Sequence, residues 1–462
     1  MENVFITISH GFQVRNFIQT RFIDELTSAY RVIFVVNQLD KSFVEKYLKR
    51  LAIKNTEVAG VVIVDKKYED TFLLLRKNIF VSPKRAQTKN ILNEMNSSTL
   101  GKWQKPLTFL NRIFGTFESS RSLWRGVEGL FLSGSEFDEL FKKYKPIKVI
   151  TGDYGTKPFE IRLLRAARRH GVPSIAVVPS WDNLTSKGVM GVKPDYLAVW
   201  NDIMRQEALE LHAFNPDKIS ITGPMQFDNF FDPSYKMPEE EFRKKFGVAE
   251  GQPVIVFGTI TPKYFKYNLE VLKILKGFVE QGTIEGNPKI IIRVHPQVVS
   301  DPILGDNLDE YKRLAADGAI FSLSLPEVQE WGTMQVPLET DYRELISILS
   351  YSRIAIASAS TIIFDSFACN TKFIGIGFDG LQPQLPKHRS VRRMFEFEHY
   401  KNVYAIGGFR IAESQKELAQ YINEYLDNPE IHKEKQLETL KQQVKFLDGQ
   451  NYQRVMKAVR EI

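Results

Sequence analysis

The sequence predicts an α/β protein with two doubly wound domains that face a cleft. Three observations support this prediction. The chain has 462 residues, too many for one ordinary core. Short apolar runs alternate with amphipathic stretches in both halves, and a stretch rich in proline and charge separates the halves around Lys236–Lys245. The expected divisions are 1–225 for a first domain, 226–446 for a second and 447–462 for a C-terminal tail.

The first half alternates short apolar strands with helices. The expected strands are Val4–Ser9, Arg31–Val36, Val58–Val64, Ile147–Thr151, Pro173–Val178, Tyr196–Trp200 and Ile219–Thr222. The expected helices include Arg15–Tyr30, Phe43–Leu51, Lys157–His170 and Asp202–Leu211. Residues 68–145 have a mostly helical pattern rich in Lys, Arg, Phe and Leu, and no role is predicted for them.

The second half repeats this alternation. The expected strands are Val254–Phe257, Lys289–Val294, Arg353–Ala357 and Phe373–Gly377, and the expected helices are Asn268–Gln281, Tyr342–Ser350, Thr361–Cys369, Gln415–Leu426 and Pro429–Phe446. Residues 297–338 are expected to be rich in loops. Strand–helix–strand spacing favours parallel sheets, in which ligands bind beyond the carboxyl ends of the strands.

Composition and charge limit the compartment and the partners. No stretch approaches the roughly 20 apolar residues of a membrane span, and the N-terminus lacks the basic region and cleavage site of a signal peptide. Cys369 is the only cysteine, which fits a reducing, cytoplasmic compartment. Residues 1–225 hold 33 Lys and Arg against 23 Asp and Glu, a net charge of +10. This charge suits an anionic membrane surface or a phosphorylated acceptor, or an ordinary solvated surface, and we expect no nucleic acid partner.

The clearest site signal is Arg293-Val294-His295-Pro296, at the end of an expected strand. Pro296 lacks an amide hydrogen and stops the strand, so His295 begins a loop. Arg293 and His295 supply donors that suit phosphate oxygens. We therefore predict that both bind a donor phosphate, although a pair that only caps a loop would give the same pattern.

A second signal is the run Ser358–Thr361, between an expected strand and an expected helix. The free amides and the positive dipole end of a helix N-terminus favour an anion. Ser360 would also suit an ordinary N-cap, and Asp365, a candidate for ribose hydroxyls, would also suit a solvent-facing position. The donor-binding candidates here are Ser358, Ser360, Thr361 and Asp365.

Three further donor-binding candidates follow the first expected strand of the second half. Hydroxyls and a lysine at such a strand end suit a diphosphate. These residues are Thr259, Thr261 and Lys263.

Polar residues also follow three expected strands of the first half. His10 follows the first strand, Asp153 follows Ile147–Thr151, and Asp182 follows Pro173–Val178. Because parallel strands end at one edge of a sheet, we expect these residues on the same edge. Asp182, or else Asp153 or His10, is the predicted base that takes a proton from an acceptor hydroxyl. Each aspartate would also suit a turn.

Several motifs of other mechanisms are missing. The sequence has no GxxxxGK[ST] loop, no GxGxxG after the first strand and no G-x-S-x-G elbow. No Asp-x-Asp follows a strand end. The sequence therefore predicts a mechanism without metal or cofactor, in which His, Arg, Ser and a helix dipole balance the charge on a leaving phosphate.

These motifs resemble a known family. Arg293–Pro296, followed later by Ser358–Thr361 and Asp365, is similar to the C-terminal domain of CDP-glycerol glycerophosphotransferases. The His-Pro and Ser/Thr pairing also resembles bacterial sialyltransferases and 3-deoxy-octulosonic acid transferases, and Ile219–Asp228 resembles the junction segment of this group and of UDP-N-acetylglucosamine 2-epimerases. The resemblance implies two Rossmann-like domains in the GT-B arrangement. It implies phosphate contacts for His295, Ser358, Ser360 and Thr361.

One segment departs from the family. Trp181-Asp182-Asn183, with Lys187 after it, is similar to a Trp-His-Gly segment of the glycerophosphotransferases. Asp182 stands where the family has histidine, so the resemblance implies the base role for Asp182. The resemblance covers residues 147–380.

We therefore expect a cytoplasmic, metal-independent transferase that is peripheral on the inner face of the cell membrane. It would move a sugar or polyol-phosphate from a nucleotide-sugar or CDP-polyol donor to a glycan or lipid-linked acceptor. Its pathway would be surface polysaccharide biosynthesis, of capsule or lipopolysaccharide. Two alternatives stay open: a UDP-N-acetylglucosamine 2-epimerase-like isomerase, and a non-enzymatic module that docks to an anionic membrane.

Overall fold

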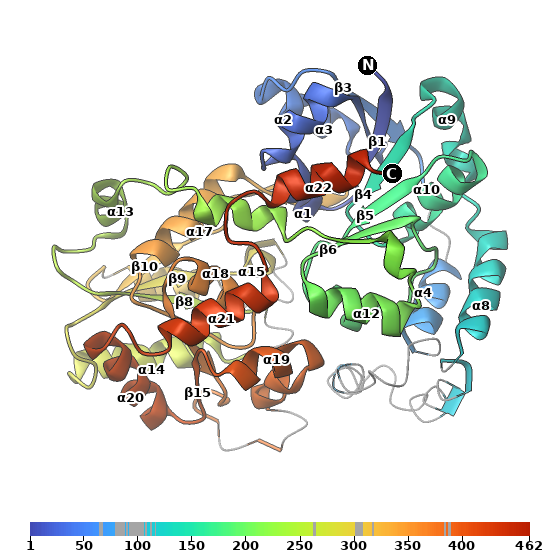
Figure 1. Ribbon diagram of the computed structural model, residues 1–462. Coiled ribbons are helices and arrows are strands. Elements are labelled where there is room, and N and C mark those ends of the chain that lie inside the picture. The colour runs from blue at the N-terminus through green and yellow to red at the C-terminus, as the bar shows by residue number, and fades with distance from the viewer. Residues whose placement is uncertain are drawn as a thin grey trace. The chain divides into compact units, whose positions relative to one another are not determined.

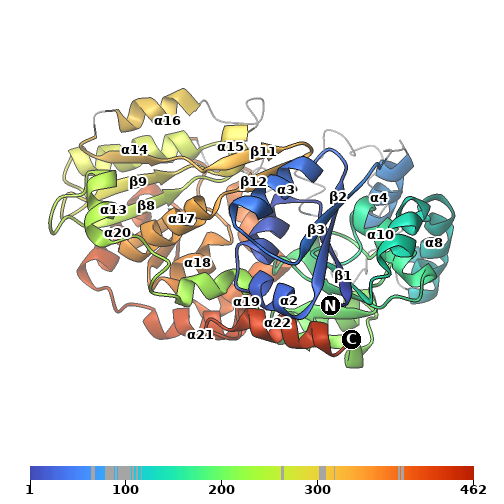
Figure 2. The same ribbon diagram turned by 90° about the horizontal axis from the view of Figure 1, so that it is seen from above.

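The computed structural model has two compact units, each built on one parallel sheet (Figures 1 and 2). The first unit comprises Met1–Asp228, Gln329–Val336 and Gln442–Ile462, and the second comprises Asn229–Val328 and Pro337–Lys441. Two parallel α/β units confirm the predicted fold class. The structure describes residues 1–63, 68–78, 88, 91, 106, 109–110, 113–115, 117–261, 265–300, 308–316, 318–382, 385–386 and 390–462.

The sheet of the first unit has seven strands in the order β3-β2-β1-β4-β5-β6-β7, and neighbouring strands run parallel. All seven expected strands of the first half are present. They are β1 (Asn3–Ile8), β2 (Arg31–Asn37), β3 (Thr56–Val61), β4 (Lys148–Thr151), β5 (Ser174–Val177), β6 (Tyr196–Val199) and β7 (Ile219–Ile221).

The first unit also contains helices. They are α1 (Gly11–Gln13), continued by a π-helical turn Val14–Ile18, then α2 (Phe22–Ala29), α3 (Lys41–Arg50), α4 (Tyr68–Asn78), α8 (Glu118–Phe131), α9 (Asp138–Tyr144), α10 (Pro158–Arg169), α11 (Asn183–Ser186), α12 (Asp202–His212) and α22 (Asn451–Arg460). Short 3₁₀ turns lie at Ser135–Phe137, Pro216–Lys218 and Met225–Phe231.

The central strands of this sheet are apolar on both faces because helices cover both. Val4 and Ile6 of β1 belong to a buried cluster with residues of α2, α3 and α22, whereas Phe5 packs with residues of α9 and α10. Successive side chains of a strand point to opposite faces. The run Val4–Ile8, apolar except for Thr7 and buried throughout, therefore fits a sheet buried on both sides.

The end of the chain is a packed helix of the first unit, where a tail was expected. Helix α22 packs against α2 (Figure 2). Asp228 accepts hydrogen bonds from the amides of Asn451 (3.0 Å) and Tyr452 (2.8 Å) at the start of α22. At its other end, Nζ of Lys148 donates to the carbonyl of Val459 (2.6 Å). Both ends of the helix are therefore satisfied by groups of the first unit.

A hairpin in the middle of the second half also belongs to the first unit. Its strands are β11 (Val328–Trp331) and β12 (Met334–Pro337). Asp40, before α3, accepts hydrogen bonds from the amide (2.6 Å) and hydroxyl (2.8 Å) of Thr333. The ring of Trp331 lies 4.8 Å from that of Tyr47. These contacts explain why Gln329–Val336 is part of the first unit.

The sheet of the second unit has six strands in the order β10-β9-β8-β13-β14-β15, again parallel. The strands are β8 (Val254–Gly258), β9 (Lys289–Arg293), β10 (Phe321–Ser324), β13 (Ile354–Ala357), β14 (Lys372–Ile376) and β15 (Arg410–Ala412). The helices are α13 (Glu239–Phe246), α14 (Asn268–Glu280), α15 (Pro296–Ser300), α16 (Leu308–Ala315), α17 (Glu339–Tyr351), α18 (Ile362–Ala368), α19 (Glu398–Ile406), α20 (Gln415–Asp427) and α21 (Lys433–Gln443), with a 3₁₀ turn at Val391–Glu396.

Candidate functional site

Three of the predicted donor-binding residues follow neighbouring strands of the second unit. His295 follows β9, Thr259 follows β8 and Ser358 follows β13, and β8 lies between the other two strands. The register pairs Gly258 with Arg293 and Phe257 with Ile356, so the three strands end at the same level. Neighbouring strands lie about 4.8 Å apart. The topology therefore brings these three residues to one short stretch of the carboxyl edge.

The backbone of His295 is fixed directly by Thr259. The amide of His295 donates to the hydroxyl oxygen of Thr259 at 2.8 Å, and the amide of Thr259 donates to the carbonyl of Arg293 at 3.0 Å. Thr259 is buried. The loop after β9 is thus tied to the loop after β8 at the position where His295 begins.

The imidazole of His295 is a neutral donor. Burial, and then the charge of Arg293, lowers the pKa of His295 to about 4. The amide of Gln297 donates to Nδ1 of His295 at 3.1 Å. An imidazole nitrogen that accepts a hydrogen bond carries no proton in the neutral ring, so the proton lies on Nε2. His295 can therefore offer an Nε2–H donor without changing its charge.

The guanidinium of Arg293 is held by carboxylates of α17. Its Nη2 lies 2.6 Å from Asp341, and its Nη1 lies 3.6 Å from Glu344 and donates to the hydroxyl of Ser324 at 2.8 Å. The side chain of Arg293 is only 8% exposed. Arg293 is therefore part of a buried structural ion pair. The sequence had instead predicted that its guanidinium binds a donor phosphate.

The predicted hydroxyl run lies where β13 gives way to α18. Ser358 is 2% exposed, and among the described residues its hydroxyl has no hydrogen-bond partner. Ser360 is half-buried and Thr361 is exposed just before α18. Asp365 lies half-buried in the first turn of that helix.

The remaining two candidates of this unit follow β8. Thr261 is buried, and its carbonyl accepts the amide of Phe265 at 3.2 Å. Lys263 lies outside the described residues.

A cavity of about 630 Å³ continues the same carboxyl edge beyond β14 and β15. Gly377–Gly380, which follows β14, and Glu413–Gln415, which follows β15, contribute to its lining. Asp379 accepts the amide of Val391 at 2.8 Å, and Arg392 pairs with Glu413 at 2.7 Å. We did not single out these residues from the sequence. The GxGxxG pattern of Gly375–Gly380, which begins in the last residues of β14 and continues into the loop after it, is a signal that would have found them.

The carboxyl edge of the first unit gathers titratable groups. The loops of His10 and Asp153 leave the neighbouring strands β1 and β4. Burial, and then the charge of Lys157, lowers the pKa of His10 to about 4, while Asp153 acts in the opposite direction. Nε2 of His10 is buried and has no hydrogen-bond partner among the described residues. His10 is therefore a neutral base at neutral pH.

Glu160, in the first turn of α10, is a member of this cluster that we missed. It is fully buried, its Oε1 accepts Nε2 of Gln13 at 3.0 Å, and the hydroxyl of Ser9 also donates to it. Burial, and then the charge of Asp153, raises the pKa of Glu160 to about 7. A glutamate in the first turn of a helix reads as an ordinary dipole partner, so the sequence held no signal for this burial.

The carboxylate of Asp153 is engaged by its own turn. One oxygen accepts the amides of Thr156 (2.6 Å) and Lys157 (3.1 Å), and the other accepts the hydroxyl of Thr156 (2.7 Å). Asp153 is 5% exposed. These contacts favour the turn role over the base role for Asp153.

Asp182 lies just before α11, in the loop after β5, which neighbours β4. Its two oxygens accept the hydroxyls of Ser180 (2.6 Å) and Ser186 (2.7 Å). Asp182 is half-buried, unlike Asp153, so its carboxylate is the more accessible of the two.

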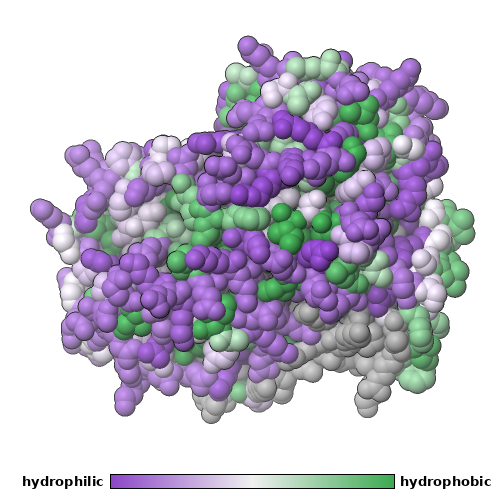
Figure 3. Space-filling model, in the orientation of Figure 1, coloured by the Kyte–Doolittle hydropathy of each residue, from purple (hydrophilic) through white to green (hydrophobic). Residues whose placement is uncertain are grey.

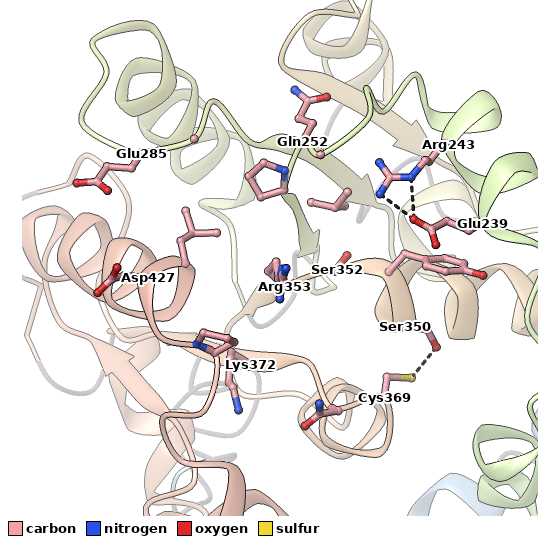
Figure 4. Close-up of a pocket in the computed structure, with 18 of the residues that line it drawn as sticks. Glu239, Arg243, Gln252, Glu285, Ser350, Ser352, Arg353, Cys369, Lys372 and Asp427 are labelled. Atoms are coloured by element: carbon pink, nitrogen blue, oxygen red, sulfur yellow. Dashed lines mark hydrogen bonds and ion pairs between the residues drawn. The ribbon is translucent and has the colours of Figure 1, made fainter.

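Another cavity of the second unit, of about 750 Å³, lies at the opposite, amino edge of its sheet (Figure 4). Ser352 and Arg353, before β13, and Lys372, at the start of β14, contribute to its lining. Cys369 also lines it, but burial raises the pKa of its thiol to about 12, so the thiol is unreactive at neutral pH. None of the predicted site residues lies here, and ligands of such sheets bind at the other edge.

The described residues contain no group of three or more His, Cys, Asp or Glu that could hold a metal ion. The prediction of a metal-free mechanism stays a prediction.

Comparisons with known proteins show the fold. No family model matches the chain, and no curated protein matches its sequence. The structure is similar to UDP-GlcNAc 2-epimerase from Neisseria meningitidis bound to UDP-GlcNAc, with 10% identity, full coverage of both chains and a TM-score of 0.56. It is similar to S. aureus MnaA, solved with UDP, with 9% identity, coverage of 100% of this chain and 96% of that chain, and a TM-score of 0.56.

A glycosyltransferase from Rickettsia africae is also similar, with 12% identity, coverage of 100% of this chain and 98% of that chain, and a TM-score of 0.52. At these identities the likeness shows the fold alone. This likeness does not show the closer relationship to CDP-glycerol glycerophosphotransferases. The chain therefore shares the GT-B fold, with two Rossmann-like domains, with these enzymes.

Proposed function

We propose that the chain is a nucleotide-dependent transferase of the GT-B class. Its donor would be a nucleotide-sugar or CDP-polyol, and its acceptor a glycan or lipid-linked glycan of a surface polysaccharide. The observation that carries the proposal is the convergence of His295, Thr259 and Ser358 at the ends of three neighbouring strands. In open α/β sheets, ligands bind beyond such strand ends.

The chemistry of this edge fits a leaving phosphate. The Nε2–H of His295 is a fixed neutral donor, and the buried hydroxyl of Ser358 has no described partner. Donors held in place before the reaction stabilise the charge that develops on a leaving group. We place the phosphates here, and the nucleoside in the neighbouring cavity beyond β14 and β15.

On the acceptor side we propose Asp182 as the base. It is half-buried, and the hydroxyls of Ser180 and Ser186 hold its carboxylate in one orientation. A base must come within hydrogen-bond reach of the hydroxyl that it deprotonates. His10, with its lowered pKa, is the second candidate. We assign Asp153 to the turn.

Nucleotide binding by two matched serine variants tests the proposal. The thermal unfolding midpoint is measured with CMP, CDP, UDP and GDP, because a ligand of the native state raises it. We expect one nucleotide to stabilise the wild type, and Ser358→Ala to lose most of that shift. Ser352→Ala is the control: Ser352 lies at the amino end of β13, where its hydroxyl donates to the carbonyl of Ile348 at 2.7 Å. A shift that survives Ser358→Ala but not Ser352→Ala would refute the proposed edge.

A 2-epimerase-like isomerase is the second candidate. The buried acid–base cluster of His10 and Glu160 favours it, because epimerisation moves protons on a sugar and needs no acceptor. Incubation with UDP-N-acetylglucosamine alone separates the two functions. An isomerase converts the sugar in this mixture, whereas a transferase leaves it unchanged until an acceptor is added.

A further inference from the structure

The hairpin β11–β12 packs against residues 9–14 of the first unit, which we call the His10 turn. Its inward-facing side chains Trp331, Met334 and Val336 are 2%, 6% and 0% exposed, and they share one buried cluster with Val14 of that turn. The outward-facing residues of the hairpin are polar and exposed. A two-stranded hairpin is marginally stable at best by itself. The hairpin therefore owes its order to this packing, and in return it covers the His10 turn.

Contacts with α3, and with Asp40 just before it, fix the position of the hairpin (Figure 2). The hydroxyl and the amide of Thr333, in the connection between the two strands, donate to the buried carboxylate of Asp40. The ring of Trp331 packs edge-on against that of Tyr47. Hydrogen bonds to a carboxylate and edge-to-face aromatic pairs both favour one geometry. The hairpin is thus a fixed support for the residues that it covers.

The backbone of β12 rests directly on Gly11, the residue after His10. A Cβ atom at Gly11 would overlap the carbonyl oxygen of Gln335 and would lie 3.0 Å from Cα of Val336. These are backbone atoms, which cannot move aside as the end of a flexible side chain can. Glycine permits this close approach because it has no Cβ. A larger residue at position 11 would therefore push the hairpin and the His10 turn apart.

The His10 turn is also tied to the acid–base cluster by Gln13. Oε1 of Gln13 accepts the amides of Ser9 (2.5 Å) and His10 (3.2 Å), and Nε2 of Gln13 donates to Glu160 at 3.0 Å. Gly11 lies between His10 and Gln13 in the chain. A displacement of Gly11 would therefore shift His10 and disturb the hydrogen bonds that connect its turn to Glu160.

We propose that the hairpin β11–β12 is a positioning element for His10 and acts through the contact of Gln335 with Gly11. The proposal rests on the proposed function, in which His10 is the second candidate base of the transferase and part of the acid–base cluster of the isomerase. The hairpin touches no substrate in this role. It holds the catalytic group in place, because a misplacement of about 1 Å can lower a rate about 100-fold. An acid–base edge built from residues 1–228 without the hairpin would be incomplete.

The protonation of His10 tests this support without any substrate. NMR follows the ring protons of the seven histidines, and the variant His10→Gln identifies the signal of His10. Burial and the charge of Lys157 lower the pKa of His10 to about 4, against the opposite effect of Asp153, so the wild-type ring should stay neutral down to about pH 5. In Gly11→Ala the added methyl group should part the hairpin from the turn and admit water to the ring. The pKa of His10 should then rise toward 6.5.

Gly126→Ala is the matched control. It makes the same substitution at a place where, beyond the helix backbone and the adjacent residues, no atom lies within 4 Å of the added methyl group. Gly126 is exposed in α8, and Figure 3 shows hydrophobic residues along the edge of the first unit over this helix. Like every other helix among the described residues, α8 lacks the length and hydrophobicity to span a bilayer. The control should leave the pKa of His10 unchanged.

Val336→Ala is the milder variant, should Gly11→Ala fail to fold. It removes two methyl groups from the buried cluster that the hairpin shares with the His10 turn. The pKa of His10 should rise in this variant as well, by a smaller amount. A pKa of His10 that stays near 4 in the variant that folds would overturn the proposal.

Turnover and nucleotide binding separate this proposal from the proposed function. Gly11→Ala should lower kcat by about 10-fold to 100-fold and change the KM for the donor little, as expected when a catalytic group is misplaced. It should keep the nucleotide-induced thermal shift of the wild type, because the donor site is assigned to the second unit. A wild type without any nucleotide shift would refute the transferase, and the titration of His10 would still decide on the hairpin. A raised pKa of His10 together with wild-type turnover would overturn the positioning role.

Discussion

The carboxyl edges of the two sheets are built on the same topology but carry different chemistry. In the second unit, the three residues that meet at the ends of β9, β8 and β13 are neutral: a histidine that burial keeps uncharged, a threonine and a serine. The permanent charge nearby, Arg293, is turned into the protein and paired. In the first unit, the edge gathers His10, Asp153, Lys157 and Glu160: Lys157 lowers the pKa of His10, and Asp153 raises the pKa of Glu160.

The edge of the second unit therefore suits the binding of a charged phosphate by donors that stay neutral. The edge of the first unit suits the transfer of protons. Neutral donors can stabilise a phosphate at any pH at which they stay neutral, so they need no titration during the reaction. A group whose pKa lies near the working pH can take up and release protons. Glu160, with a pKa of about 7, is such a group.

The largest effect expected concerns the stability of the second unit. Arg293→Ala should destabilise it by about 3–5 kcal/mol, because Asp341 would remain buried without its cation. Urea unfolding measures this loss. Arg353→Ala is the control, since Arg353 is an exposed arginine beside the same sheet. Unchanged stability of Arg293→Ala together with lost nucleotide binding would return Arg293 to the phosphate role.

The second prediction concerns the neutral donor itself. His295→Ala should lower turnover by about 100-fold, which is the scale of losing one preorganised donor, while the fold is kept. The readout is the transfer rate with the nucleotide that the thermal-shift screen selects. His295→Gln, whose side-chain amide can also donate a hydrogen bond, should recover part of the loss. Turnover close to that of the wild type in His295→Ala would remove His295 from the site.

Much of the fold could be predicted because its signals are local. The run Val4–Ile8 is apolar except for Thr7 and is bounded by polar residues, so its strand was predictable, as were the other six strands of the seven-stranded sheet. The placement of α22 was not predictable in this way. The contacts of Asp228 and Lys148 that anchor it come from residues more than 200 positions away, and no local pattern records such a contact.

The candidate site also has one part that local sequence signals predict and another part that depends on distant contacts. Strand-end positions such as Thr259, His295 and Ser358 were found because the carboxyl ends of parallel strands meet at one edge. What each side chain contacts there depends on distant groups. Arg293 has the sequence context of a phosphate ligand, yet Asp341 and Glu344 of α17 take up its guanidinium. The sequence context of Glu160 is that of a surface residue. In the structure, however, its carboxylate accepts hydrogen bonds from Ser9 and Gln13.

The third prediction concerns the pH dependence of the first unit. The pKa of Glu160 is about 7 in the folded protein and 4.5 without its surroundings. Between these values the folded state holds a proton that the unfolded state releases, so this group makes stability fall as pH rises from about 4.5 to 7. Glu160→Gln cannot titrate and keeps an acceptor for Ser9 and Gln13. It should therefore be more stable than the wild type at pH 8 by about 2 kcal/mol, and about equal at pH 5.

Urea unfolding at several pH values measures how the difference in stability between Glu160→Gln and the wild type changes from pH 5 to pH 8. Glu139→Gln is the control, because the side chain of Glu139 in α9 is 84% exposed and should give parallel curves. Curves for Glu160→Gln that stay parallel to the wild type would mean that Glu160 does not titrate in this range. The inference that the carboxyl edge of the first unit holds a group that titrates near neutral pH would then be wrong.

The smallest effect expected concerns the bond between Thr259 and His295. Thr259→Val keeps the shape of the side chain but removes the oxygen that accepts the amide of His295. The unsatisfied amide should cost about 1 kcal/mol in stability, and the freed loop should weaken nucleotide binding about 3-fold to 10-fold, because His295 would no longer be held in place. Thr259→Ser retains the acceptor and should restore both quantities. If Thr259→Val instead lowers stability without changing nucleotide affinity, the position of His295 does not depend on this bond, and preorganisation of the neutral edge must come from the Gln297 contact alone.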